Sequence, residues 1–153
     1  MYKKILVPLD GSELAECVLP HVESIASGCG VESVIFLRVI DSYVPSTVEA
    51  YITKEQRREA DERAETVVRE YLDQVVSRVQ LDGVEIQKQL ITGRTSESIA
   101  EYATKNDADL VIIATHGRSG ISRWVWGSVA DRILRSACVP VLMVRAPGCV
   151  PGI

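Results

Sequence analysis

The sequence predicts one α/β domain in which a five-stranded parallel sheet carries helices on both faces. Short apolar runs of strand length alternate with segments of helical periodicity along the whole chain, and this alternation is typical of βαβ units. Runs such as Val34–Leu37 and Leu110–Ile113 are continuously apolar, as expected for parallel strands buried on both sides. A chain of 153 residues with 46% apolar and 25% charged residues is large enough for one core and too short for two enzyme domains.

The first third of the chain predicts a strand, a helix and a second strand. The first strand is expected at residues 3–9, and an Asp-Gly-Ser turn ends it at Ser12. Because serine is a favoured helix N-cap, a helix is expected over residues 12–27, and a Gly-Cys-Gly sequence ends it. The second strand is expected at 33–40, and residues 41–53 are expected to form a loop.

A long helix is predicted next, from Lys54 to about Gln80. Its apolar residues recur at spacings of three and four, as they do on one face of a helix. They are Ala60, Ala64, Val67, Val68, Tyr71, Leu72, Val75, Val76 and Val79. Thirteen of the 25 residues from Lys54 to Arg78 are charged, so the opposite face of this helix is expected to lie in water.

The remaining chain repeats the alternation of strands and helices. Strands are expected at 84–91, 109–115 and 139–145, and helices at 96–105 and 129–136. Residues 116–127 are rich in Gly and Ser and are expected to form a loop. With no repeat or linker in the sequence, one domain is expected over residues 1–146, followed by a flexible tail at 147–153.

Charge and composition exclude several classes of partner. The formal net charge of −4 argues against nucleic acid, because a phosphate backbone would repel the chain. No apolar run approaches the roughly 18 residues of a membrane helix. The chain begins directly with a strand, so a cytoplasmic location is expected. The four cysteines form no C-x-x-C pair and there are only two histidines, so no metal site is expected.

The strongest functional signal lies between Ala114 and Ser128. In open parallel sheets, ligands bind outside the carboxyl ends of the strands, and here the chain leaves a strand, passes three glycines and reaches a helix N-terminus. Free N–H groups of the first helical turn and the Ser128 hydroxyl suit a phosphate. Residues 114–145 hold five arginines against one acid. The alternative is that the glycines only permit turns and Ser128 only caps the helix.

Four motifs lie toward the two ends of the chain. They are ILVPLDGS at residues 5–12, THGRSG at 115–120, GSVADRIL at 127–134 and VPVLMV at 139–144. Together they resemble the universal stress protein family, and the resemblance covers about residues 1–145. It implies a Rossmann-like or flavodoxin-like domain with strand order 3-2-1-4-5. It also implies a homodimer formed through the last strand, Val139–Val144.

The ATP-binding type of this family carries the pattern G-x-x-G, nine residues, then G-[S/T]. Gly117, nine intervening residues, Gly127 and Ser128 fit it, and Ala114 occupies the position of the first glycine. The resemblance implies binding of ATP or AMP, with Mg²⁺ or Mn²⁺ held through the phosphates. The carboxylate of Asp10 would bond to the ribose or adenine, and the main chain of Val39 would contact adenine. The residues expected to bind the nucleotide are Pro8, Leu9, Asp10, Val39, Ala114, Gly117, Arg118, Gly127, Ser128 and Val129.

The function expected from the resemblance is a cytoplasmic module that senses or signals through ATP or AMP in the stress response. No catalytic residue is expected, and at most slow ATP hydrolysis, because no activated nucleophile or general base stands beside the loop. One alternative is a family member that binds no nucleotide and acts through dimerisation and protein partners. A phospho-acceptor receiver domain is excluded, because Asp10 has no acidic neighbour and no lysine follows Lys105.

Overall fold

The computed structural model describes residues 1–41, 53–115 and 128–145. Within them, one parallel sheet has the strand order β3-β2-β1-β4-β5, which confirms the predicted fold class and the order implied by the resemblance. The strands are β1 (Lys4–Pro8), β2 (Ser33–Asp41), β3 (Glu85–Gly93), β4 (Leu110–Ala114) and β5 (Val141–Val144). Every pair of neighbouring strands runs parallel, so all carboxyl ends meet at one edge of the sheet.

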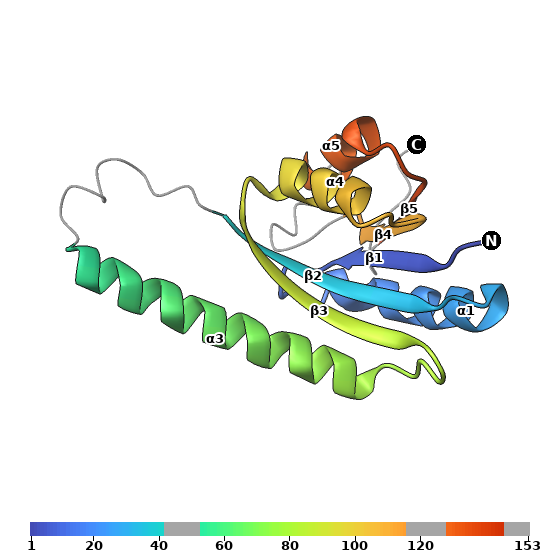
Figure 1. Cartoon of the computed structure of the whole chain (residues 1–153), viewed down its shortest axis with the longest axis horizontal. Coiled ribbons are helices and arrows are strands. Elements are labelled where there is room, and N and C mark those ends of the chain that lie inside the picture. Colours follow the sequence, from blue (N-terminus) through green and yellow to red (C-terminus); the bar gives the residue numbers. More distant parts are fainter. Residues whose placement is uncertain (42–52, 116–127, 146–153) are drawn as a thin grey trace.

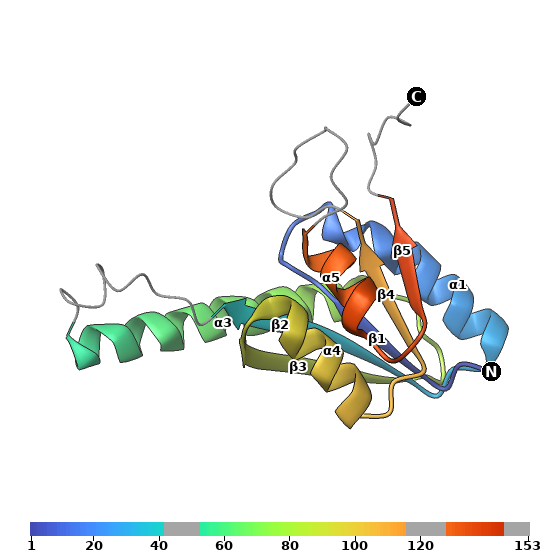
Figure 2. The same ribbon diagram turned by 90° about the horizontal axis from the view of Figure 1, so that it is seen from above.

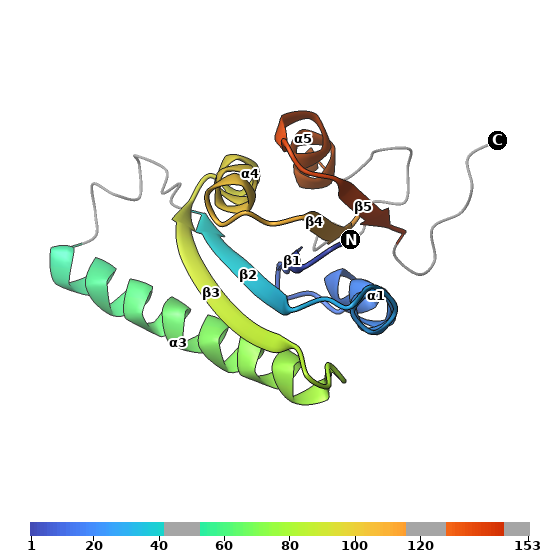
Figure 3. The same cartoon turned by 45° about the vertical axis from the view of Figure 1, so that its right-hand side comes forward.

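Helices cover both faces of this sheet. They are a short 3-10 helix η1 (Ala15–Val18) and the α-helices α1 (Leu19–Cys29), α3 (Lys54–Arg78), α4 (Thr95–Lys105) and α5 (Ser128–Ser136). Figure 3 shows α1 and α3 on one face of the sheet and α4 and α5 on the other. This arrangement is the one that right-handed βαβ connections produce.

The alternation of side chains along β1 divides the core in two. Ile5 and Val7 belong to the cluster beneath η1, α1 and α3, together with Leu72 and Val75 of α3. Leu6 points to the opposite face and belongs to the cluster with α4 and α5. Since successive strand residues point to opposite faces, β1 contributes side chains to the core on both sides of the sheet. This packing holds the carboxyl end of β1 in place.

The predicted helix over 12–27 is wrong in its first turns. Residues 15–18 form η1, and the α-helix begins only at Leu19. Proline at position 20 explains the break, because it has no N–H to donate to the carbonyl of Glu16. The α-helix ends at Cys29, two residues later than predicted, where Gly30 adopts a left-handed conformation with φ of 64°.

Helix α3 begins at Lys54 as predicted, with Thr53 and Gln56 forming a reciprocal capping box. Only its carboxyl-terminal half packs on the sheet, and the amino-terminal half projects beyond it (Figures 1 and 2). Residues 53–67 are all exposed, and the side chain of Val67 is 64% exposed. The first part of the predicted apolar stripe is therefore not core, because the sheet ends before it.

The other boundaries lie within two residues of those predicted. The last strand begins at Val141 rather than at residue 139, because Pro140 cannot donate to a ladder; its carbonyl accepts from the Val111 N–H at 2.9 Å. At the same amino edge of the sheet, one oxygen of Asp109 accepts from the N–H groups of Lys3 and Lys4, each at 2.8 Å. In the described part of the chain, no helix is long and apolar enough to cross a membrane.

Candidate functional site

The carboxyl edge of the sheet brings the ends of β2, β1 and β4 together. The chain order reverses between β1 and β4, and such a reversal is where parallel sheets bind ligands. Pro8 ends β1, Val39 lies near the end of β2, and Ala114 ends β4. The three are buried. The sequence thus predicted correctly that these residues share one edge.

Asp10 lies just beyond β1 and is held by a turn of its own. Its Oδ1 accepts from the Ser12 N–H at 2.9 Å and from the Ser12 hydroxyl at 2.5 Å. The Ser12 Oγ in turn accepts from the Ala15 N–H at 3.2 Å, which leads the chain into η1. Gly11 between them has φ of 82°, a conformation that favours glycine. The half-buried carboxylate of Asp10 is therefore fixed at the edge rather than swinging freely.

Two polar side chains beneath α3 complete this side of the edge, and the sequence analysis missed them. Arg38 of β2 is half-buried, and its Nη1 donates to the carbonyl of Leu9 at 3.2 Å. Tyr71 of α3 belongs to the same neighbourhood: burial, the Glu16 carboxylate and the Asp10 carboxylate raise the pKa of its phenol, and Arg38 opposes that shift. The signal for Arg38 was present in the sequence, because it is the one charged residue in the apolar run 34–40.

On the other side of β1, the described chain resumes at the N-terminus of α5. Ser128 is its exposed first residue and Val129 is half-buried. Before the gap, the buried Thr115 extends the pairing of β4 with β5 by donating its N–H to the carbonyl of Val144 at 2.8 Å. The other predicted members of the site, Gly117, Arg118 and Gly127, lie outside the described residues, so their part in it stays a prediction.

The described residues do not supply a protein-built metal site. None of their His, Cys, Asp and Glu side chains gather in groups of three or more that could hold an ion. The described cysteines, Cys17, Cys29 and Cys138, are free thiols.

Comparison with known proteins agrees with this geometry. Residues 1–145 match the model of the Universal stress protein family. Universal stress protein MJ0531 of Methanocaldococcus jannaschii is 30% identical over 154 residues, which span 96% of this chain and 84% of that protein. The solved structure of MJ0577, described as a structure-based assignment of biochemical function, has a TM-score of 0.83 and 28% identity, covering 97% of this chain and 99% of that one.

More distant structures share the fold and carry nucleotides. A universal stress protein family protein of Arabidopsis thaliana, solved with AMP bound, has a TM-score of 0.64 and 16% identity, with 95% of this chain and 93% of that chain covered. The universal stress protein of Archaeoglobus fulgidus, solved with dAMP, has a TM-score of 0.59 and 21% identity over 93% of this chain and 97% of that one. The family match over nearly the whole chain and the shared strand order lead to one conclusion: this chain belongs to the universal stress protein family.

Proposed function

We propose that this protein binds an adenine nucleotide, ATP or AMP, at the carboxyl edge of its sheet and acts as a sensing or signalling module in the stress response. The observation that carries the proposal is the pairing of two features across β1. The Asp10 carboxylate is fixed on one side, and the N-terminus of α5 begins at Ser128 on the other. A hydroxyl-binding acid and a phosphate-binding helix end suit the two halves of a nucleotide. Relatives of the same fold carry AMP and dAMP.

The nucleoside would lie at the β1–β2 side of the edge. There the Asp10 carboxylate would accept from the ribose or the adenine, the Val39 main chain would meet the base, and Pro8 and Leu9 would line its pocket. The phosphates would lie toward α5, bound by the main-chain N–H groups of the residues Gly117, Gly127, Ser128 and Val129 and by the Ser128 hydroxyl, with Arg118 contributing charge. Phosphate at this place benefits from the unpaired N–H groups of the first helical turn.

Ala114 is compatible with this assignment. Its side chain belongs to the core cluster beneath α1 and α3, where the residue is 8% exposed. The methyl group that distinguishes it from glycine is therefore directed into apolar packing. A methyl group placed there would not obstruct a nucleotide at the edge of the sheet.

Binding rather than catalysis is the proposed role, and we assign no catalytic residue. Mg²⁺ or Mn²⁺ would accompany ATP as a ligand of the phosphate oxygens and would neutralise part of their charge. The protein would contribute the fixed acid at Asp10 and the helix end at Ser128, which select and orient the nucleotide.

Calorimetric titration of the purified protein with AMP and with ATP, with and without Mg²⁺ or Mn²⁺, tests the proposal. We expect saturable binding by the wild type. The Gly127→Val variant should lose ATP binding while its circular dichroism spectrum is unchanged, because a side chain there obstructs main-chain contact with the phosphates. A wild type that binds neither nucleotide at millimolar concentration would overturn the assignment and leave dimerisation and protein partners as the route of action.

We also propose that two copies pair through β5. This strand lies at the edge of the sheet, and Val141, Leu142 and Met143 are only partly buried in the single chain. An edge strand offers unpaired N–H and C=O groups, and a two-fold axis lets one patch pair with itself. The apolar strand segment Val139–Val144 is the surface that such a pair would cover.

A further inference from the structure

Arg38 is a charged side chain placed where the pairing of β1 with β2 ends. The register of the two strands ends at the pair Pro8 and Leu37. One residue further, the Leu9 N–H donates to the carbonyl of Leu37 at 2.9 Å. If the ladder continued, the Leu9 carbonyl would accept from the Val39 N–H. The Arg38 guanidinium reaches that carbonyl, with its Nη1 at 3.2 Å, so a side chain takes the next position of the ladder.

The hydrogen bond from Arg38 to the Leu9 carbonyl has consequences for both strands. On β1, the carbonyl of Leu9 is held by Arg38, and the following residue is Asp10, which the Ser12 turn then fixes. On β2, the main chain of Val39 lies beyond the last registered pair with β1. The Arg38 guanidinium therefore helps to position Asp10, and it occupies the Leu9 carbonyl with which the Val39 N–H would otherwise pair.

The surroundings of Arg38 keep its guanidinium in place. Tyr71 lies near enough for Arg38 to affect its pKa, and burial together with the nearby Glu16 carboxylate raises that pKa, so the phenol stays neutral. The Tyr71 hydroxyl is buried beside the Glu16 carboxylate. Glu16 has a side chain only 16% exposed and is bound by the Arg78 guanidinium at 2.8 Å. The half-buried Arg38 thus lies near Tyr71 of α3, whose own neighbour Glu16 belongs to η1.

We propose that Arg38 is a positioning residue for the nucleoside end of the site, an inference that rests on the proposed nucleotide binding. It need not touch the ligand. It ends the β1–β2 ladder, holds the Leu9 carbonyl and thereby places Asp10 and the main chain of Val39 for recognition of the adenosine. A guanidinium suits this task because its planar fork of donors is rigid and remains charged when half-buried.

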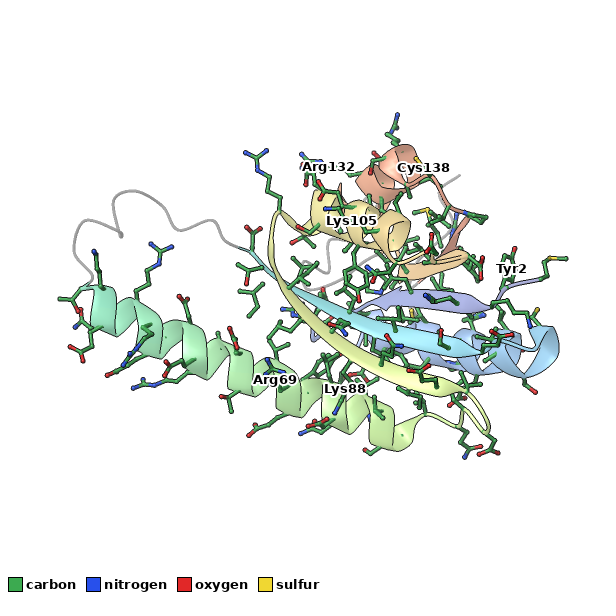
Figure 4. All side chains as sticks on the ribbon, in the orientation of Figure 1. Tyr2, Arg69, Lys88, Lys105, Arg132 and Cys138 are labelled. Atoms are coloured by element: carbon green, nitrogen blue, oxygen red, sulfur yellow. The ribbon has the colours of Figure 1, made fainter. Side chains whose placement is uncertain are left out.

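The test compares Arg38→Met, Arg38→Lys and the control Arg69→Met. Arg69 also carries one positive charge, but it lies on α3 with a side chain 68% exposed and pairs with Glu65 of the same helix (Figure 4). Titration with AMP and with inorganic triphosphate separates the two ends of the site. We expect Arg38→Met to weaken AMP binding about tenfold, the scale of one lost charge-assisted hydrogen bond, and to leave triphosphate binding within about twofold of the wild type. Arg38→Lys should recover part of the loss, and Arg69→Met should change neither titration.

A second readout needs no nucleotide. The Ser12 N–H donates to Asp10, so its hydrogen exchange in the free protein reports on whether that turn is held. We expect exchange at Ser12 to be about tenfold faster in Arg38→Met, with the Lys4 N–H, which is bound to Asp109, unchanged as a measure of global stability. AMP binding and Ser12 exchange both equal to wild type would overturn the inference while leaving the proposed function intact. A wild type that fails to bind AMP would overturn both.

Discussion

Ser12 donates two hydrogen bonds to one oxygen of Asp10, one from its backbone N–H at 2.9 Å and one from its hydroxyl at 2.5 Å. The same hydroxyl oxygen accepts from the Ala15 N–H. A single small side chain therefore joins the end of β1 to the start of η1 and orients the acid proposed to recognise the nucleoside.

Ser12→Ala is expected to destabilise the fold and weaken the site together. The free energy of unfolding should fall by about 1 kcal/mol, as when other capping hydroxyls are removed. AMP affinity should fall several-fold, because the Asp10 carboxylate loses the donor that the Ser12 hydroxyl supplies. Urea denaturation and calorimetry measure the two effects. Ser24→Ala, at an exposed position of α1, is the control and should change neither quantity; equal behaviour of the two variants would contradict the prediction.

Substitutions at Asp10 separate its charge from its turn. Asp10→Asn keeps an oxygen for the Ser12 N–H, so the fold should be unchanged in thermal denaturation, whereas Asp10→Ala removes the turn as well. Both variants should bind AMP more weakly than the wild type, with Asp10→Ala the weaker, and both should bind inorganic triphosphate as the wild type does. If triphosphate binding fell as far as AMP binding, Asp10 would not belong to the nucleoside end of the site.

The ionisation of Asp109 is expected to make the free energy of unfolding depend on pH in the acid range. The Asp109 carboxylate accepts hydrogen bonds from the N–H groups of Lys3 and Lys4, and these bonds lower the pKa of Asp109. A carboxyl whose pKa is lowered by folding stabilises the protein above its ordinary value of about 3.9, and that stability is lost as the pH falls below it through the folded-state pKa. Urea denaturation between pH 6 and about 2.5 should therefore show a difference between wild type and Asp109→Asn that is greatest near pH 6 and shrinks in acid. A difference independent of pH would mean that the charge of Asp109 is immaterial.

Leu142→Lys tests the proposed pairing of two copies through β5. Leu142 is partly buried in the single chain and packs against the core cluster beneath α1. A lysine there would place like charges near the two-fold axis, and only a variant that still folds tests the interface. Light scattering should give a dimer for the wild type and a folded monomer for the variant, with circular dichroism confirming the fold. Val67→Lys, at an exposed position of α3, should remain dimeric. A monomeric wild type would rule the interface out.

Most of the fold could be predicted because its signals are local. Continuous apolar runs located the strands, and capping and glycine patterns located most helix ends to within two residues. The wrong predictions concern residues whose local sequence pattern is correct but whose burial depends on the neighbouring elements. Ala60, Ala64 and Val67 continue the helical period of the α3 core, yet the sheet stops before they reach it. Their exposure depends on the relative lengths of the helix and the strands, which no periodicity records.

The candidate site was predictable to the extent that it lies at strand ends. Asp10 follows one apolar run and Val39 lies near the end of another, and parallel topology brings such ends together. Arg38 was missed because it lies within a strand, where a charged residue is ordinarily assigned to solvent. Tyr71 was missed because it was assigned to the apolar face of its helix. Only the pairing of β2 with β1 and the packing of α3 beneath them show that Arg38 turns inward to the Leu9 carbonyl.

The unsupported half of α3 has a mechanical consequence. From Tyr71, which lies near Arg38, the helix runs for about 25 Å to Lys54, given a rise of 1.5 Å per residue. Its packed end lies next to the proposed nucleoside end of the site, and its amino-terminal end lies beyond the sheet. A tilt of the whole helix by roughly 10° would displace Lys54 by roughly 4 Å relative to Tyr71. Small rearrangements around Tyr71 would thus be magnified at a distance from the site.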